Sequence, residues 1–191
     1  SKHSSGVLGG TAMRILEEYQ RRLNVAVIII LFILFMGGMF VMRCLAGKVA
    51  AYNDFQTILD LRLGYSFVEC QSYIWGLGEA GRWFYANCFF YVDIGYMIIY
   101  NIFYFSALSF LLEKTGLKKY KFVLFFPLLS FVFDLGENLL IRKMIKDFLA
   151  IGQGICYTSN IFTVLKFIFT YGSLGVCGLL VVVLIKHHVA R

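Results

Sequence analysis

Four long apolar runs constrain the fold of this chain more than any other feature. The membrane spans that they predict cover residues 24–42, 83–112, 122–141 and 158–185. A helix needs about 20 predominantly apolar residues to cross the hydrocarbon core of a bilayer, and each run comes close to this length or exceeds it. The second run is longer than a bilayer requires, so we expect that helix to tilt or to protrude.

The composition leads to the same fold class. Of the 191 residues, 60% are hydrophobic and 15% are charged, whereas a soluble domain has about 25% charged residues. A chain of this size cannot bury so much apolar surface in a water-soluble core, and it is too apolar to be disordered. We therefore expect an all-α integral membrane bundle of four transmembrane helices, forming a single domain over residues 1–191, and no soluble enzyme.

The distribution of the basic residues predicts the orientation of the bundle. The net charge is +7, but the charges flank apolar runs, where they serve as topology signals and headgroup contacts rather than as a nucleic-acid surface. More Lys and Arg residues lie on the side of the two termini and of the loop 113–121 than on the other side. Both termini should therefore face the cytoplasm, or the matrix if the membrane is the mitochondrial inner membrane, which is our first expectation.

Two segments between the spans carry apolar residues at helical spacing without being long enough to cross a membrane. Segment 47–82 has apolar residues that fit two helix faces, the first with Val49, Phe55, Ile58 and Leu59 and the second with Phe67, Tyr73 and Ile74. Segment 142–155 has a similar pattern. We expect short amphipathic helices on the membrane surface in both places.

The glycines Gly76, Gly78 and Gly81 match the letters of a dinucleotide-binding GxGxxG motif. That motif requires a buried strand before it and a soluble helix after it, whereas here a predicted span follows. We therefore expect no nucleotide and no other cofactor. The glycines more simply allow a surface helix to end and to turn close against the second span.

Four ionisable residues and a neighbouring asparagine lie inside the predicted spans, where a charge costs roughly 2.5–3.5 kcal/mol at a helix centre. They are Asp93, Asp134, Glu137, Asn138 and Lys166. At about 1.5 Å per residue, these positions lie about 10–15 Å below the same membrane face on three different helices. The spacing of Asp134, Glu137 and Asn138 also puts them on one helix face. We expect one buried polar cluster in which Lys166 pairs with a carboxylate.

Two interpretations of this cluster remain open. It is either a structural lock, meaning ion pairs that hold the helices together, or a site that handles protons or lipid headgroups. The sequence contains no recognisable catalytic or metal-binding motif, so we expect no catalytic residue and no bound metal. The five cysteines show no metal-ligand spacing, and we expect them to act mainly as small apolar side chains. Arg82, Arg142 and Lys143 are expected to contact phospholipid headgroups.

Several short motifs give the chain a resemblance to a known family. They are Leu63-Gly-Tyr-Ser66, Leu77-Gly-x-x-Gly-Arg82 with Tyr85, Asp93 with Tyr96 and Tyr100, Asp134-x-x-Glu-Asn138, and Ser159-x-x-x-Thr163-x-x-Lys166. In this order they resemble an uncharacterised family of small four-helix membrane proteins, over about residues 60–170. The chain departs from that family in lacking a proline before Tyr96. The resemblance implies the four-helix fold and the polar cluster, and it implies no activity.

The absence of a catalytic motif and the many small and aromatic side chains favour one function. We expect a non-catalytic accessory subunit of a larger membrane complex, first of all a mitochondrial respiratory-chain assembly. The alternative is a stand-alone small transporter or lipid-handling protein that uses the Asp/Glu/Lys cluster. The expected partners are phospholipids and other integral membrane subunits, and not nucleic acid. We also expect a partner to bind the polar N-terminal segment 1–13, because terminal segments are ordered only where something holds them.

Overall fold

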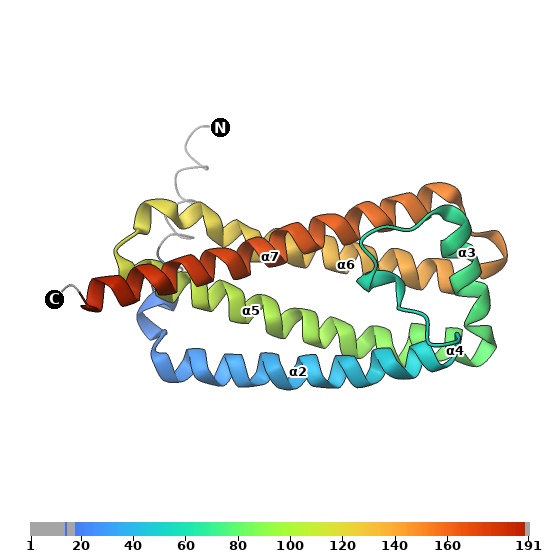
Figure 1. Ribbon diagram of the computed structural model, residues 1–191, viewed down its shortest axis with the longest axis horizontal. Helices are drawn as coiled ribbons and strands as arrows, with labels where there is room; N and C mark the ends of the chain where they lie inside the picture. The colour runs from blue at the N-terminus through green and yellow to red at the C-terminus, as the bar shows by residue number, and fades with distance from the viewer. Residues whose placement is uncertain (1–13, 15–17, 190–191) are drawn as a thin grey trace.

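A computed structural model describes residue 14 and residues 18–189, and every regular element in this part of the chain is helical. Four long helices lie roughly side by side in an elongated bundle (Figure 1). They are α2 (Val25–Ala51), α5 (Phe90–Thr115), α6 (Phe125–Lys146) and α7 (Gln153–Val189). The prediction of an all-α bundle is confirmed. Four helical stretches are long and apolar enough to cross a membrane, which is compatible with an integral membrane protein.

The long helices alternate in direction along the bundle. As a result, the start of α2 and the end of α7 lie at one end, which we call the terminal end (Figure 1). The opposite end, which we call the far end, holds α3 (Phe67–Gly76), α4 (Gly78–Phe84) and the short 3-10 turn η4 (Phe148–Ala150). The largest cluster of buried apolar residues also lies toward the far end, and it includes Val49, Tyr73 and Phe89.

All four spans extend beyond their predicted boundaries. The second is a continuous helical stretch from Gly78 to Thr115, in which a π-helical turn, η2 (Tyr85–Phe89), joins α4 to α5. Similarly, α2 continues to Ala51, α6 to Lys146, and α7 runs from Gln153 to Val189. Charged residues such as Arg43 and Arg142 end the apolar runs without ending the helices, because long basic side chains are compatible with a helix at the membrane boundary.

The expectation of a surface helix over residues 142–155 is wrong. The end of α6, the turn η4 and the start of α7 occupy that segment. The expectation for segment 47–82 is right only in part. Val49 belongs to α2, and residues 52–66 form an irregular connection with one 3-10 turn, η1 (Leu59–Leu61). Both Leu59 and Asp60 are buried, so this connection packs into the bundle instead of lying on its surface.

Local sequence signals explain why α3 begins and ends where it does. The Ser66 side chain accepts a hydrogen bond from the Glu69 backbone N–H, and the Glu69 carboxylate accepts one from the Ser66 backbone N–H, which is a capping box. The helix ends at Gly76, and Gly78 has φ +62°, a conformation that glycine adopts without strain. Its face with Tyr73 and Ile74 is fully buried, so α3 is a packed element.

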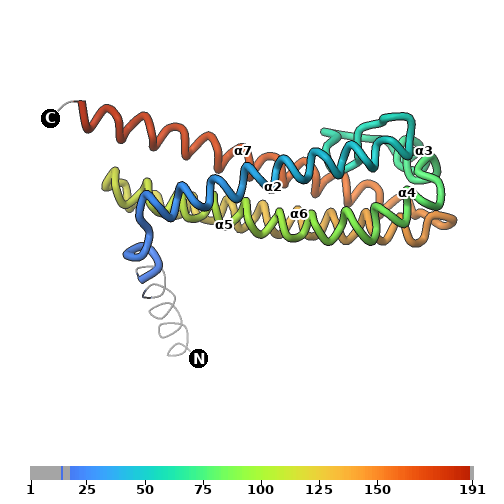
Figure 2. The backbone as a smooth tube through the Cα atoms, turned by 90° about the horizontal axis from the view of Figure 1, so that it is seen from below, coloured from blue at the N-terminus to red at the C-terminus, as the bar shows by residue number. Residues whose placement is uncertain are grey.

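The long helices pack against one another through small residues and aromatic rings. A Cβ atom on Gly38 of α2 would lie 2.7 Å from the Tyr96 ring of α5, and one on Gly136 of α6 would lie 2.6 Å from the Phe162 ring of α7. Phe35 of α2 stacks on Phe103 of α5 with ring centroids 5.1 Å apart. Toward the terminal end, α7 diverges from α5 and α6 (Figure 2).

Candidate functional site

Lys166 is the centre of the buried polar network. Its Nζ atom lies 2.6 Å from Glu137 Oε2 and 3.5 Å from Asp134 Oδ1, and it donates a hydrogen bond of 3.0 Å to the backbone carbonyl of Asp60. The lysine is only 7% exposed. It stands on α7, whereas both carboxylates that it pairs with stand on α6, so the ion pairs connect these two helices.

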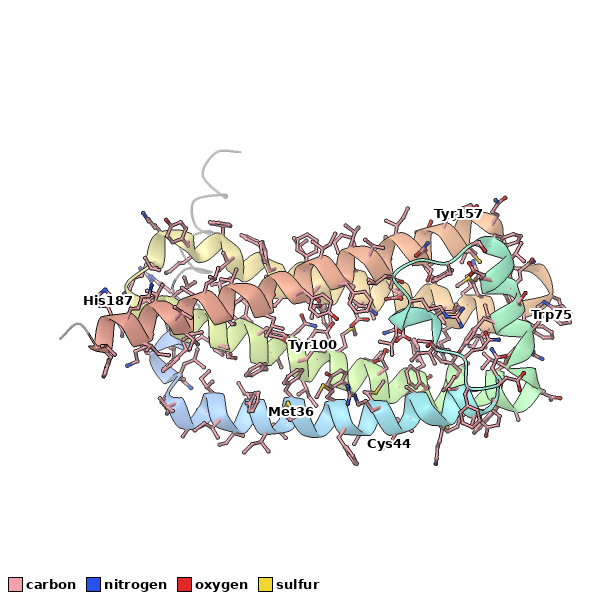
Figure 3. The ribbon with its side chains drawn as sticks, viewed as in Figure 1. Met36, Cys44, Trp75, Tyr100, Tyr157 and His187 are labelled. Carbon is pink, nitrogen blue, oxygen red and sulfur yellow. The ribbon has the colours of Figure 1, made fainter. Side chains whose placement is uncertain are left out.

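The carboxylates around Lys166 have further partners on other helices. The Thr163 hydroxyl donates to Glu137 Oε1 at 2.5 Å, and the Tyr100 hydroxyl donates to Asp134 Oδ2 at 2.5 Å. Tyr100 is the labelled residue in the interior of the bundle in Figure 3. Because Tyr100 stands on α5, these contacts tie three helices together at one level.

Asn138 links the remaining predicted residue to this network. Its side-chain amide donates to Asp93 Oδ2 at 2.6 Å and to Asp134 Oδ1 at 3.4 Å. The structure thus brings together the five residues that the sequence singled out. We call these five and Asp60 the polar cluster: Asp60, Asp93, Asp134, Glu137, Asn138 and Lys166.

Asp60 is the member of the polar cluster that sequence reasoning missed. It lies in η1, outside the long helices, yet it is only 5% exposed. Its carboxylate accepts a long hydrogen bond of 3.5 Å from Tyr85 in the π-helical turn η2. Burial raises the pKa of the Asp60 carboxyl above its ordinary value, and the positive charge of Lys166 opposes this effect. Depth matching along the spans could not find Asp60, because the loop that carries it folds into the bundle.

The polar cluster contains four carboxyl groups and one amine. Within the described residues, the salt bridges to these carboxylates all come from Lys166. If all four acids were ionised, the bundle would hold three uncompensated negative charges away from water, at a cost of several kcal/mol for each. The charge balance of the polar cluster therefore depends on Lys166, the one amine among the described residues that pairs with these acids.

A line of hydroxyl groups continues from the polar cluster toward the terminal end. The Tyr100 hydroxyl lies 3.4 Å from Ser130 Oγ, and Ser130 Oγ lies 2.6 Å from Thr170 Oγ1. Ser130 was not singled out from the sequence, and Tyr100 was named only in the family motif with Asp93 and Tyr96, not among the predicted site residues. The position of Tyr100, two helical turns after Asp93, was the signal that could have indicated it.

The residues expected to contact headgroups lie at the far end. The Arg82 guanidinium stacks over the Phe148 ring at 3.8 Å, and it lines a groove of about 430 Å³ with Trp83, Lys146 and other residues. Arg142 donates to the Ala86 carbonyl at 3.1 Å and to the Tyr91 hydroxyl at 2.9 Å. Lys143 is exposed. Headgroup contact by these residues stays a prediction.

The three glycines of the GxGxxG pattern have structural roles. Gly78 supplies the turn between α3 and α4, a Cβ atom on Gly76 would overlap Asn53 Oδ1, and one on Gly81 would lie 2.7 Å from Tyr52 Cβ. The glycines therefore allow α3 and α4 to pack against the segment that follows α2. In the described part of the chain, no group of three or more His, Cys, Asp or Glu side chains has the geometry to hold a metal ion.

The N-terminal segment 1–13, for which we expected a partner, lies outside the described residues. The chain was also compared with known proteins. No family model, no curated protein and no solved structure matches it significantly.

Proposed function

We propose that the chain is a non-catalytic integral subunit of a larger membrane complex. The observation that carries the proposal is how little of α2 and of the terminal-end part of α7 the chain itself covers. In an apolar stretch of 18 residues from each helix, only 6% of the residues are buried in α2 and only 11% in α7. The corresponding share in the stretch Gly78–Thr115 is 50%. Two of the four long helices thus offer most of their surface to other molecules in the membrane.

Outward-facing glycines support protein partners in addition to lipid. A Cβ atom added to Gly37 of α2, or to Gly175 or Gly178 of α7, would meet no atom of another described segment within 4 Å. Small residues on the outer face of a membrane helix allow a second helix to approach closely, which strengthens van der Waals packing between them. Within residues 18–189, these glycines have no such neighbour.

An apolar groove adds a second surface of this kind. It lies between α2 and α7, with α5 as its floor, and has a volume of about 280 Å³. Its lining includes Phe32, Tyr104 and Val181. A lipid acyl chain or the apolar side chains of a neighbouring subunit fit its chemistry, in agreement with the two classes of partner expected from the sequence.

In this proposal the polar cluster is a structural lock. Each of its carboxyl groups has a hydrogen-bond or ion-pair partner inside the chain. The contacts join the irregular connection 52–66, α5, α6 and α7. The first assembly to test is a respiratory-chain complex of the mitochondrial inner membrane, whose matrix side would then face both termini.

The size of the tagged chain on a native gel, after mild detergent extraction from its own membranes, tests the proposal. We expect migration in a large assembly that fractionates with the mitochondrial inner membrane. The substitution Gly178→Ile should release the chain from this assembly without unfolding it, because the site has open space in the chain. Val132→Phe, an exposed position on α6, is the matched control. Migration of the natural chain as a monomer or small oligomer contradicts the proposal.

The excess of acids over amines in the polar cluster favours a second candidate function, a stand-alone transporter or lipid-handling protein. Four carboxyl groups surround one lysine, and the hydroxyl groups of Tyr100, Ser130 and Thr170 extend the network toward one end. Proton uptake by vesicles containing the purified chain, under a pH gradient, tests this candidate. If Glu137→Gln abolishes proton uptake while the chain still folds, the transporter candidate is favoured over the accessory subunit.

A further inference from the structure

Two cysteines from distant parts of the sequence meet at the far end of the bundle. Cys70 stands on α3 and Cys156 on the first turn of α7, and 86 positions separate them. Their Sγ atoms are 2.6 Å apart, closer than two unbonded sulfur atoms pack. The two side chains are 0% and 1% exposed. Such an approach brings α3 and α7 within reach of a covalent link.

The surroundings of the pair test whether it is a metal site. The only other sulfur atom that contacts both cysteines within the described residues is Met144 Sδ, 3.7 Å from Cys70 and 3.4 Å from Cys156. Three soft ligands suit an ion such as Cu⁺. However, two thiolates that bind one metal ion at about 2.3 Å, with a tetrahedral angle between them, lie about 3.8 Å apart. The observed separation is too short for that arrangement.

We propose that Cys70 and Cys156 form a disulfide bond that fastens α3 to the start of α7. The bond would form by thiol–disulfide exchange with a small-molecule or protein disulfide, such as oxidised glutathione. The two thiols give up their protons and two electrons as the S–S bond forms, and the donor disulfide is reduced to two thiols. All five cysteines are unbonded in the structure, and the other three, which are partly or fully exposed, stay free thiols in this proposal.

Burial determines when this bond forms. In the packed structure an oxidant cannot reach either sulfur atom, and burial raises the pKa of the Cys70 thiol well above its ordinary value. Exchange requires an accessible thiolate. The bond therefore forms before α3 packs onto α7, and once buried it is protected from reducing agents.

The disulfide also assigns the far end to a compartment. Disulfides persist in oxidising compartments and are rare where glutathione and thioredoxin keep thiols reduced. The far end is opposite the start of α2 and the end of α7 (Figure 1). The distribution of Lys and Arg independently predicts that this side is not the cytoplasm or matrix. This argument does not depend on the proposed function.

Peptide mapping of the full chain tests the disulfide directly. Two preparations are compared. In the first, free thiols are alkylated in acid-quenched membranes. In the second, they are alkylated in chain that was briefly unfolded in detergent and equilibrated with oxidised glutathione. Trypsin then releases Cys70 in the peptide 63–82 and Cys156 in the peptide 147–166. We expect a linked species two hydrogens lighter than the sum of both peptides, and its disappearance on reduction. The absence of the linked peptides from both preparations would overturn the proposal.

Counting thiols in variants tests the pairing. After alkylation of the free thiols, reduction should expose two new thiols in the natural chain and none in Cys70→Ser or Cys156→Ser. Cys88→Ser is the matched control, and it should still expose two. A bond that joins other cysteines would appear as two new thiols in Cys70→Ser, which contradicts the proposal. If the serine variants fail to fold, the peptide map of the natural chain still decides.

Discussion

At the scale of single residues, the stability of the bundle depends on a few buried charges. Lys166 contacts acids from α6 and the backbone of η1 at once. A buried ion pair gains little over a well-packed apolar pair, but removing one partner leaves an uncompensated charge away from water. The consequences of changing Lys166 therefore depend on what is changed with it.

Replacing Lys166 by methionine should lower the free energy of unfolding by about 3–5 kcal/mol. In Lys166→Met/Glu137→Gln, at least half of this loss should be recovered, because the closest unpaired carboxylate is removed as well. Thermal unfolding in one detergent at neutral pH measures both effects. Lys118→Met is the control, since its pair with Glu113 is 56% and 44% exposed and should be worth at most about 1 kcal/mol. A double variant less stable than Lys166→Met would refute the ion-pair account.

The same experiment separates the two interpretations of the polar cluster. If the cluster is a structural lock, the neutral double variant should recover both assembly and function. If it handles protons or headgroups, assembly should return while function stays absent. Native-gel size and vesicle proton uptake are the two measurements.

Asp60 should make stability depend on pH. Its pKa is raised in the folded chain by burial, so unfolding above the ordinary value of about 3.9 releases a proton. Its contribution to stability is complete below that value and is lost as the pH rises toward the raised folded pKa. In Asp60→Asn this decline should be weaker, which unfolding at a series of pH values measures. Glu69→Gln is a control of opposite sign, because backbone hydrogen bonding lowers the pKa of Glu69, so its contribution is lost as the pH falls.

At the scale of elements, the far end depends on close contacts between α3, α4 and the segment after α2. The π-helical turn η2 joins α4 to α5 and carries Tyr85, which reaches Asp60. Turns of this kind often occur at functional positions in helices. Here the turn brings the loop that carries Asp60 into contact with the second span. Glycines at Gly76 and Gly81 keep the connecting backbone close to its neighbours.

Gly81→Ala should therefore destabilise the chain by about 1–3 kcal/mol, because the added methyl group meets Tyr52 Cβ at 2.7 Å. Gly95→Ala, in the interior of α5, is the matched control. It has open space, and alanine favours a helix over glycine by up to about 1 kcal/mol, so this variant should be at least as stable as the natural chain. Thermal unfolding midpoints measure both. Equal midpoints for the two variants would contradict the close-contact account.

At the scale of the whole molecule, the alternating helices put the terminal end and the far end at opposite ends of the bundle, and we expect these two ends on opposite sides of a membrane. Asp54 and Glu79 are exposed at the far end, whereas Cys70 is fully buried there. Labelling experiments on sidedness must therefore use introduced cysteines at exposed positions and not the natural Cys70.

Asp54→Cys and Glu79→Cys should react with a membrane-impermeant maleimide only from the side opposite a tag after Arg191. The natural chain, whose Cys44 is exposed, supplies the background labelling. When protease is added to the side from which the maleimide reacts, the tag should stay uncleaved, because it lies on the other side of the membrane. Reaction of Asp54→Cys from the tagged side would contradict the four-span arrangement.

The sequence by itself determined the features that depend on local composition and periodicity. The four spans follow from runs of apolar residues, and the level of Asp93, Asp134 and Lys166 follows from the fixed rise of a helix. The grouping of Asp134 with Glu137 and Asn138 follows from helical spacing. These inferences needed no knowledge of which helices are neighbours.

Only the tertiary structure decided the contacts between segments distant in the sequence. Asp60 reaches Lys166 across 106 positions, and Cys70 meets Cys156 across 86. No periodicity along the chain encodes these pairs, because they depend on how the connection 52–66 and α3 fold back onto the bundle. The helix ends were also decided there, since packing at the far end continues α2 and α6 beyond the charged residues that close their apolar runs.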